Sequence, residues 1–195
     1  MTSRNNMKWK LGVWYKVEGK LMPCNNGLHA CDSIYNSLRY NESRLFVAEY
    51  RGERVDEVNK FCAREMRITQ EIKDTKKKLV KFAVACAKRV LPIFEKEHPN
   101  DKRPRIAIEE ASKFGTKKFD KKKCRDAACA ADTTYYANAA YAAAYAAAYA
   151  AYAASHADYA AYYASNAAHA AYASKDRHKE RAWQRKKCDE IFLSD

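Results

Sequence analysis

The sequence predicts an α+β protein, in which a small N-terminal module of mixed sheet and helix precedes a helical bundle rich in alanine and tyrosine. Short stretches that mix aromatic and β-branched residues, as strands do, lie within residues 7–72, whereas later apolar residues recur at three- and four-residue intervals. The 195 residues include only five glycines and four prolines, which argues against a loop-rich chain. We therefore assign residues 1–72 to the α+β module and residues 73–195 to the bundle.

The N-terminal module is predicted to contain three strands and one short helix. Aromatic and β-branched residues within 7–17 are typical of an opening strand, and residues 45–50 and 63–72 have the same character. An Asn-Asn-Gly turn at 25–27 precedes a helix that begins at Asp32-Ser33, a good N-cap pair, and reaches about Tyr40.

Residues 74–115 are predicted to form two helices. Apolar side chains recur with helical spacing over residues 79–94, and lysines and arginines occupy the remaining positions. Pro92 is expected to bend or break this first helix. Pro104 suits the first turn of a second helix, which Gly115 would end.

Residues 116–195 contain neither glycine nor proline, and about half of residues 127–173 are alanine, the best helix former. A continuous helix over residues 133–175 would span roughly 65 Å, so we expect it to fold back. The candidate breaks are Asp132-Thr133, the capping box Ser155-His-Ala-Asp158 and Ser165-Asn166. Steps of four, four and three residues place four tyrosines on one stripe: Tyr141, Tyr145, Tyr149 and Tyr152.

The formal charge of +13 is concentrated in the middle of the chain. Residues 73–126 hold 18 basic and 8 acidic side chains, against 12 and 9 in residues 1–72 and 7 and 7 in residues 127–195. This local excess is expected to attract an acidic protein, a phosphorylated small molecule or nucleic acid. A lysine-rich face that only aids solubility is an equal alternative.

The seven cysteines form an odd set without a Cys-x-x-Cys pair, so we expect reduced thiols, with Cys86 packed inside a helix. We expect no metal and no cofactor, although Cys24, His29, Cys31 and Cys62 could be assembled on paper into a zinc site. The chain has no long apolar stretch and no hydrophobic signal core, so neither membrane insertion nor secretion is expected. A cytoplasmic location follows.

The sequence has no glycine-rich nucleotide motif, no Gly-x-Ser-x-Gly and no His-Glu-x-x-His, so we predict a binding protein rather than an enzyme. The predicted ligand- or partner-binding residues are Lys102, Arg103, Arg105, Tyr145, Tyr149, Tyr152, His156 and His169. Two alternatives stay open: Asp101, Arg103 and Arg105 could staple their loop to the bundle, and the tyrosines could fill helix seams. The tyrosine–alanine stripe also allows a homodimer.

Several blocks resemble known families. The chain resembles the immunity protein family called Imm-5-like over about residues 79–187, in Cys86-Ala-Lys-Arg-Val-Leu-Pro-Ile-Phe-Glu95, Asp101-Lys-Arg-Pro-Arg-Ile-Ala-Ile-Glu109, the alanine-rich run and Glu180-Arg-Ala-Trp-Gln184. Over about residues 7–72 it is similar to an uncharacterised phage and bacterial domain, in Gly27-Leu-His-Ala, Leu38-Arg-Tyr40, Val47-Ala-Glu-Tyr-Arg-Gly-Glu53 and Asn59-Lys-Phe-Cys-Ala-Arg64. The first resemblance implies toxin neutralisation by binding, in a phage or prokaryotic conflict setting.

The same N-terminal blocks look like the central portion of an ADP-ribosyltransferase fold, which implies a nicotinamide pocket with His29, Tyr35 and Tyr40 as candidates. Three hypotheses result. The first is an immunity-like or anti-defence-like protein that neutralises an acidic partner or sequesters an anionic ligand. The second is binding of nucleic acid or a nucleotide signal by the basic segment and the tyrosines, and the third is an ADP-ribosyltransferase-like enzyme.

Overall fold

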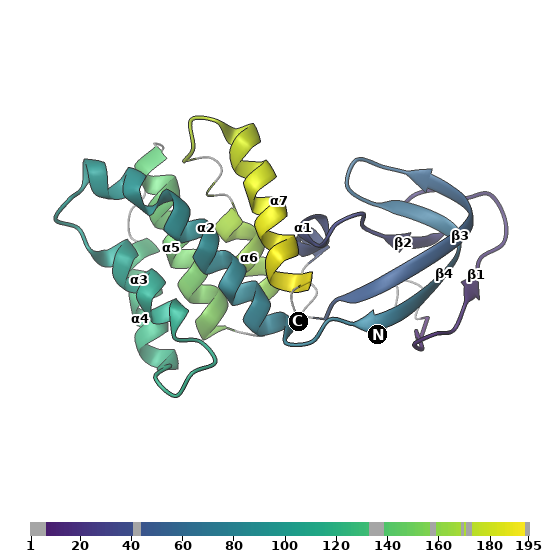
Figure 1. The fold of residues 1–195 in the computed structure, drawn as a ribbon, viewed down its shortest axis with the longest axis horizontal. Helices are drawn as coiled ribbons and strands as arrows, with labels where there is room; N and C mark the ends of the chain where they lie inside the picture. The colour runs from purple at the N-terminus through teal and green to yellow at the C-terminus, as the bar shows by residue number, and fades with distance from the viewer. Residues whose placement is uncertain are drawn as a thin grey trace. The chain divides into compact units, whose positions relative to one another are not determined.

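The structure, a computed structural model, describes residues 7–40, 44–132, 139–156, 159–168, 170 and 173–193. The fold class is α+β, as predicted: a small antiparallel sheet is followed by several helices (Figure 1). The chain divides into two compact units. The first, residues 1–37 and 44–73, is called the sheet unit, and the second, residues 38–43 and 74–195, is called the helical unit.

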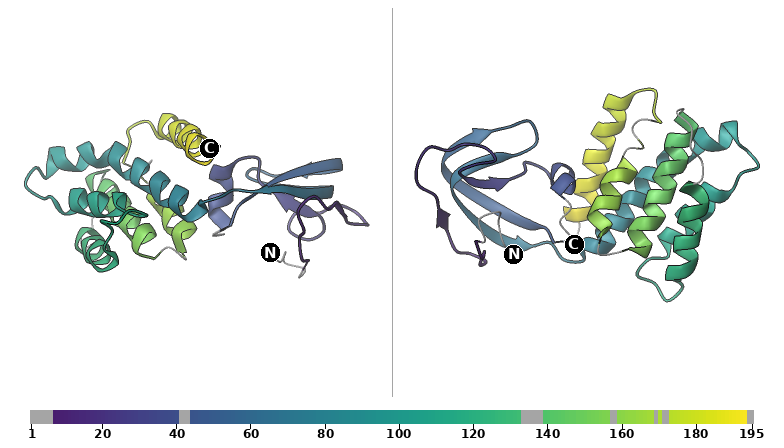
Figure 2. Two further views of the ribbon diagram at one scale, coloured as in Figure 1. Left: turned by 60° about the horizontal axis from the view of Figure 1, so that its bottom comes forward. Right: turned by 180° about the vertical axis from the view of Figure 1, so that it is seen from behind.

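The sheet is organised around β4 (Phe61–Glu71), which pairs antiparallel with three other strands. The long strand β3 (Phe46–Asp56) lies along one edge and forms a hairpin with it, seen in two further orientations in Figure 2. The short strands β1 (Tyr15–Lys16) and β2 (Leu28–Ala30) follow one another along the other edge. Side chains of Leu28, Phe61, Ala63 and Met66 form the buried core of this unit.

Several N-terminal boundaries differ from those predicted. Of residues 7–17, only β1 is a strand, and Leu11 forms an isolated bridge to Ile68. The strand predicted at 45–50 extends to Asp56, because the charged residues beyond Tyr50 pair across the hairpin instead of turning. The predicted helix appears as α1 (Ile34–Ser37) followed by the 3-10 turn η1 (Leu38–Tyr40).

The helical unit is centred on α5 (Ala139–Ser155), which packs against four other helices. Alanines of α5 from 140 to 154 are mostly buried, and their small side chains allow neighbours to approach on several sides. The packing neighbours are α2 (Thr75–Glu97), α3 (Arg103–Ser112), α4 (Lys121–Asp132) and α6 (Ala160–Ala167). The last helix, α7 (Arg177–Leu193), packs on α2.

The predicted helix ends are partly confirmed. Pro92 lies inside α2 without ending it, Pro104 lies in the first turn of α3, and Gly115 follows with φ +77°. Helix α5 ends at Ser155, as predicted. Thr133, which follows the break predicted at Asp132, lies outside the described residues, as do Asp158 of the proposed capping box and His169. Helix α6 ends at Ala167, one residue after the break predicted at Ser165-Asn166.

Among the helices that the structure describes, none combines the length and the apolar character needed to cross a membrane.

Candidate functional site

Six aromatic side chains from α5, the residue after it and α6 form a contiguous group, which we call the tyrosine cluster. The members are Tyr145, Tyr149, Tyr152, His156, Tyr162 and Tyr163. The ring centroids of Tyr145 and Tyr149 are 4.3 Å apart, and the rings of Tyr152 and Tyr163 stack at 5.5 Å. Tyr145 is 39% exposed and Tyr162 is 42% exposed, so the cluster reaches the surface.

The phenol hydroxyls of the cluster are linked to each other and to α4. The hydroxyls of Tyr145 and Tyr149 are 2.5 Å apart, and the Tyr152 hydroxyl donates to Asp132 Oδ2 at 3.2 Å. Burial raises the pKa of Tyr149 and of Tyr152, and the neighbouring Tyr145 hydroxyl and Cys129 thiol raise them further. These phenols therefore remain neutral and can donate hydrogen bonds at neutral pH.

The structure brings together four of the residues predicted to bind a ligand or partner: Tyr145, Tyr149, Tyr152 and His156. The His156 ring lies 5.9 Å from that of Tyr163, and its Nδ1 is 3.0 Å from Ser155 Oγ. The prediction missed Asp132 and Tyr163, because both reach the cluster from other helices. An acidic residue at the end of a predicted helix was the available signal for Asp132, since acids are unfavourable there.

The predicted cations at the start of α3 contact the bundle itself. Arg105 donates two hydrogen bonds of 2.7 Å to Glu95 of α2, and Arg103 pairs with Asp101, which lowers the pKa of that carboxyl. Arg103 also reaches the Ala130 carbonyl of α4 at 3.4 Å. Lys102 Nζ donates to the Pro99 carbonyl at 2.6 Å. These contacts are those expected if the three residues hold this segment of the chain to the bundle. A binding role for the three cations stays a prediction.

A different group of cations lies around the start of α4, and we call it the basic end. Its members are Lys77, Lys117, Lys118, Lys121, Lys122 and Lys123, all exposed. Lys77 of α2 is included because its side chain lies against Gly115, shortly before α4. A Cβ atom built on this glycine would be 3.4 Å from Lys77 Cε. Within the described ranges, none of the ion pairs includes one of these six lysines.

The charges at the start of α4 oppose the helix dipole. Its first turn carries three lysines and no acid. Each such charge costs about 0.3–1 kcal/mol near an exposed helix end. Asp120 offsets part of this cost, because it accepts the backbone N–H of Lys123 at 3.0 Å, a bond that lowers the pKa of Asp120. Helix stability therefore does not explain the three lysines of the first turn.

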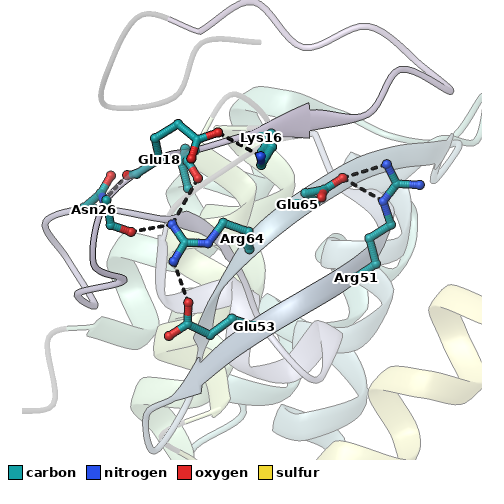
Figure 3. Close-up of polar contacts among 9 residues, drawn as sticks. Lys16, Glu18, Asn26, Arg51, Glu53, Arg64 and Glu65 are labelled. Atoms are coloured by element: carbon teal, nitrogen blue, oxygen red, sulfur yellow. Dashed lines mark hydrogen bonds and ion pairs between the residues drawn. The ribbon is translucent and has the colours of Figure 1, made fainter.

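In the sheet unit, Arg64 joins three partners. It donates to the carbonyls of Val17 and Gly19 and pairs with Glu53 (Figure 3). Asn26 holds the same turn with a bond of 2.8 Å to the Glu18 carbonyl (Figure 3) and a bond of 3.0 Å to the Lys20 carbonyl. These contacts fix a loop onto the sheet and leave no obvious catalytic arrangement among the residues drawn.

The three residues of the predicted N-terminal pocket do not share a unit. His29 on β2 accepts the backbone N–H of Cys24 at 2.9 Å. Tyr35 lies in α1 of the sheet unit, whereas Tyr40 belongs to the helical unit. A pocket formed by these residues stays a prediction.

The cysteines are free thiols, and Cys86 is fully buried, as predicted. Burial raises the pKa of Cys124 and of Cys188 to about 12, so these thiols are poor nucleophiles. Over the residues that the structure describes, no group of three or more His, Cys, Asp or Glu side chains is arranged to hold a metal ion.

Comparison with protein families gives two matches. Residues 70–191, more than half of the chain, match the family described as Imm-5 like putative immunity protein, and residues 1–79 match a domain of unknown function, DUF7666. Neither match supports the resemblance to an ADP-ribosyltransferase. No curated protein and no solved structure gives a significant match to the chain.

Proposed function

The chain belongs to the Imm-5 like putative immunity protein family, and from that premise we propose that its helical unit neutralises an acidic protein partner by binding it. The basic end is the observation that carries this proposal. Its six lysines are exposed and lack intramolecular ion pairs among the described residues. Carboxylates of a partner would satisfy charges that the fold leaves uncompensated.

The energetics of α4 support a binding role over a solubility role. Lysines that only aid solubility can lie anywhere on a surface, whereas Lys121, Lys122 and Lys123 lie where the helix dipole opposes them. Positive side chains and the dipole act in the same direction here, so their combined potential is strongest at this end. Such a potential accelerates association with an acidic protein and favours one orientation of docking.

The test is capture of a partner from a lysate of the source cell, followed by affinity measurements with the purified pair. The variant Lys121→Glu/Lys122→Glu reverses two charges of the basic end. The matched control, Lys88→Glu/Lys96→Glu, makes the same change in net charge at exposed positions of α2 outside the basic end. We expect the first variant to weaken binding by about tenfold or more and the control by much less, because close charge pairs dominate electrostatic docking.

Stability measurements keep this test interpretable. Glutamate is favoured at a helix N-terminus, so Lys121→Glu/Lys122→Glu should raise the free energy of unfolding by about 0.3–1 kcal/mol per substitution. A loss of binding by a more stable variant cannot be explained by misfolding. Full binding by this variant, or an equal loss in the control, would contradict the proposal.

The same experiment separates the other hypotheses. Capture that disappears after nuclease treatment would favour nucleic acid, and its affinity should then fall by about 0.7–0.9 log units per phosphate contact for each log unit of salt. A captured phosphorylated small molecule would favour sequestration of an anionic ligand. The half-buried rings of Phe114 and Phe119, 5.2 Å apart beside the basic end, would then be candidates for stacking.

A further inference from the structure

The tyrosine cluster and Asp132 form a region of opposite character to the basic end. Asp132 is exposed, and one of its carboxylate oxygens accepts the Tyr152 hydroxyl at 3.2 Å. Ring faces carry negative potential, and several rings gather within ring-contact distance of Tyr152. An electronegative region on a chain of net charge +13 needs an explanation.

Packing alone does not provide that explanation. Asp132 is the last residue of α4 that the structure describes, and its side chain is exposed. Among the described residues no ion pair includes Asp132, and Arg125 of the same helix lies 3.9 Å from Asp126 instead. A serine or asparagine at position 132 could accept the Tyr152 hydroxyl equally well at no electrostatic cost, so the charge itself is the unexplained property.

We propose that Asp132 and the adjoining face of the tyrosine cluster bind the guanidinium of an arginine side chain from a protein partner. An arginine fits this chemistry better than a lysine, because its planar head can stack on a tyrosine ring while its N–H groups donate to a carboxylate. A phosphate-bearing ligand is disfavoured by the same carboxylate. The proposal rests on the proposed function for the identity of the partner, but the chemistry of the subsite does not depend on it.

The position of the subsite is compatible with one partner that contacts both surfaces. The lysines that begin α4 and Asp132 at its end are about 15 Å apart at about 1.5 Å per residue. A protein interface of ordinary size covers this distance. A partner that is acidic overall and presents one arginine beyond its acidic surface would match the charge pattern along α4.

The test uses the full chain and a defined probe, N-acetyl-arginine methylamide, titrated while the tyrosine ring signals are followed by NMR. N-acetyl-citrulline methylamide is the matched control probe, since it has nearly the same shape and no charge. We expect saturable shifts of the Tyr145, Tyr149 and Tyr152 signals with the arginine probe and at least about fivefold weaker binding of the citrulline probe, a factor typical of an exposed charge pair of about 1 kcal/mol.

Variants assign the effect to the carboxylate. Asp132→Asn should weaken binding of the arginine probe about fivefold, whereas Asp126→Asn, an exposed carboxylate on the same helix, should leave it unchanged. Asp132→Asn keeps the size of the side chain and an acceptor for the Tyr152 hydroxyl, so it is expected to fold, and its thermal unfolding checks this. Absence of saturable shifts, equal binding of citrulline, or unchanged binding by Asp132→Asn would each overturn the proposal.

The result of the arginine titration does not depend on whether a partner is captured. Failure of the arginine titration with successful lysine-dependent capture would reject the subsite and keep the proposed function. Success of the titration without any captured partner would support the subsite and count against an acidic protein as the partner.

Discussion

The sheet unit and the helical unit use their charged side chains in opposite ways. Each of the five described arginines of the sheet unit pairs with an acid: Arg44 with Glu71, Arg51 with Glu65, Arg54 with Asp32, Arg64 with Glu53 and Arg67 with Glu49. The helical unit instead leaves the six lysines of the basic end without an acidic neighbour in the ion pairs of its described residues. The sheet-unit arginines are thus neutralised within the fold, whereas the lysines of the basic end are not.

The geometry of the hairpin explains the difference. Arg51 lies directly opposite Glu65, and Glu49 lies opposite Arg67, so cross-strand neighbours neutralise each other. The guanidinium of Arg51 also lies 4.3 Å from the ring centroid of Trp14, and that of Arg54 lies 3.8 Å from the ring of Phe61. In a unit with a small apolar core, these side chains cover the sheet as well as carrying charge.

The largest expected effect tests whether sheet-unit charges are structural. Arg64→Met replaces the aliphatic stem of the side chain but removes the donors to two carbonyls and to Glu53. We expect the free energy of unfolding of the sheet unit to fall by about 2–3 kcal/mol, measured by urea denaturation followed by tryptophan fluorescence. Arg51→Met, which removes a more exposed arginine, should cost less than about 1 kcal/mol. Equal losses would show that position in the network is unimportant.

An intermediate effect is expected at a buried ion pair of the helical unit. Glu180 of α7 is buried and accepts Arg89 Nε of α2 at 2.7 Å, while the Arg89 guanidinium lies over Trp183. Glu180→Gln removes the ion pair and should cost about 1–2 kcal/mol in thermal or urea unfolding, a reduced value because Arg89 is 43% exposed.

The control for this prediction lies on the same helix. Glu190 pairs with Lys187 at the surface, so Glu190→Gln should change the free energy of unfolding by less than about 0.5 kcal/mol. If both substitutions had the same small effect, the helical unit would contain no structural ion pair at this interface.

The smallest effect concerns pH. Hydrogen bonds from Arg44 lower the pKa of Glu71 below its ordinary value, so the folded state favours the ionised carboxylate. The stabilisation is therefore present above the ordinary pKa of a glutamate and is lost as the pH falls through the lowered value. NMR titration should give Glu71 a depressed midpoint, and Arg44→Gln should return it toward that of a free glutamate. An unchanged midpoint in the variant would assign the shift to another neighbour.

Local sequence patterns predicted much of the fold, because they reflect interactions between residues that are close together in the sequence. The periodicity of α2 and the alanine content of α5 identified both helices, and Gly115 marked the end of α3. Helix α6 runs one residue past the break predicted at Ser165-Asn166, because the Asn166 side chain donates to the Tyr162 carbonyl within α6 instead of capping a new helix. Polar residues that usually interrupt helices can thus be accommodated inside one.

The candidate site was less predictable because it depends on packing between helices. Spacing along α5 placed the tyrosines on one stripe, but it could not show that Tyr163 stacks on Tyr152 or that Asp132 accepts its hydroxyl. The pairing of Arg105 with Glu95 likewise joins residues ten positions apart on two helices. Counting charges along the sequence located the excess of basic residues. Only the positions of the acidic side chains in the structure show which of these basic residues form ion pairs.

The alanine surface of α5 also constrains how this protein can change. Because several helices contact α5 through methyl groups, one additional methyl group at a buried position such as Ala147 must be accommodated by more than one neighbour at once. Tyrosines on the exposed stripe have no such restriction. Substitutions can therefore accumulate at exposed rings, such as those of Tyr145 and Tyr162, while the interior stays the same.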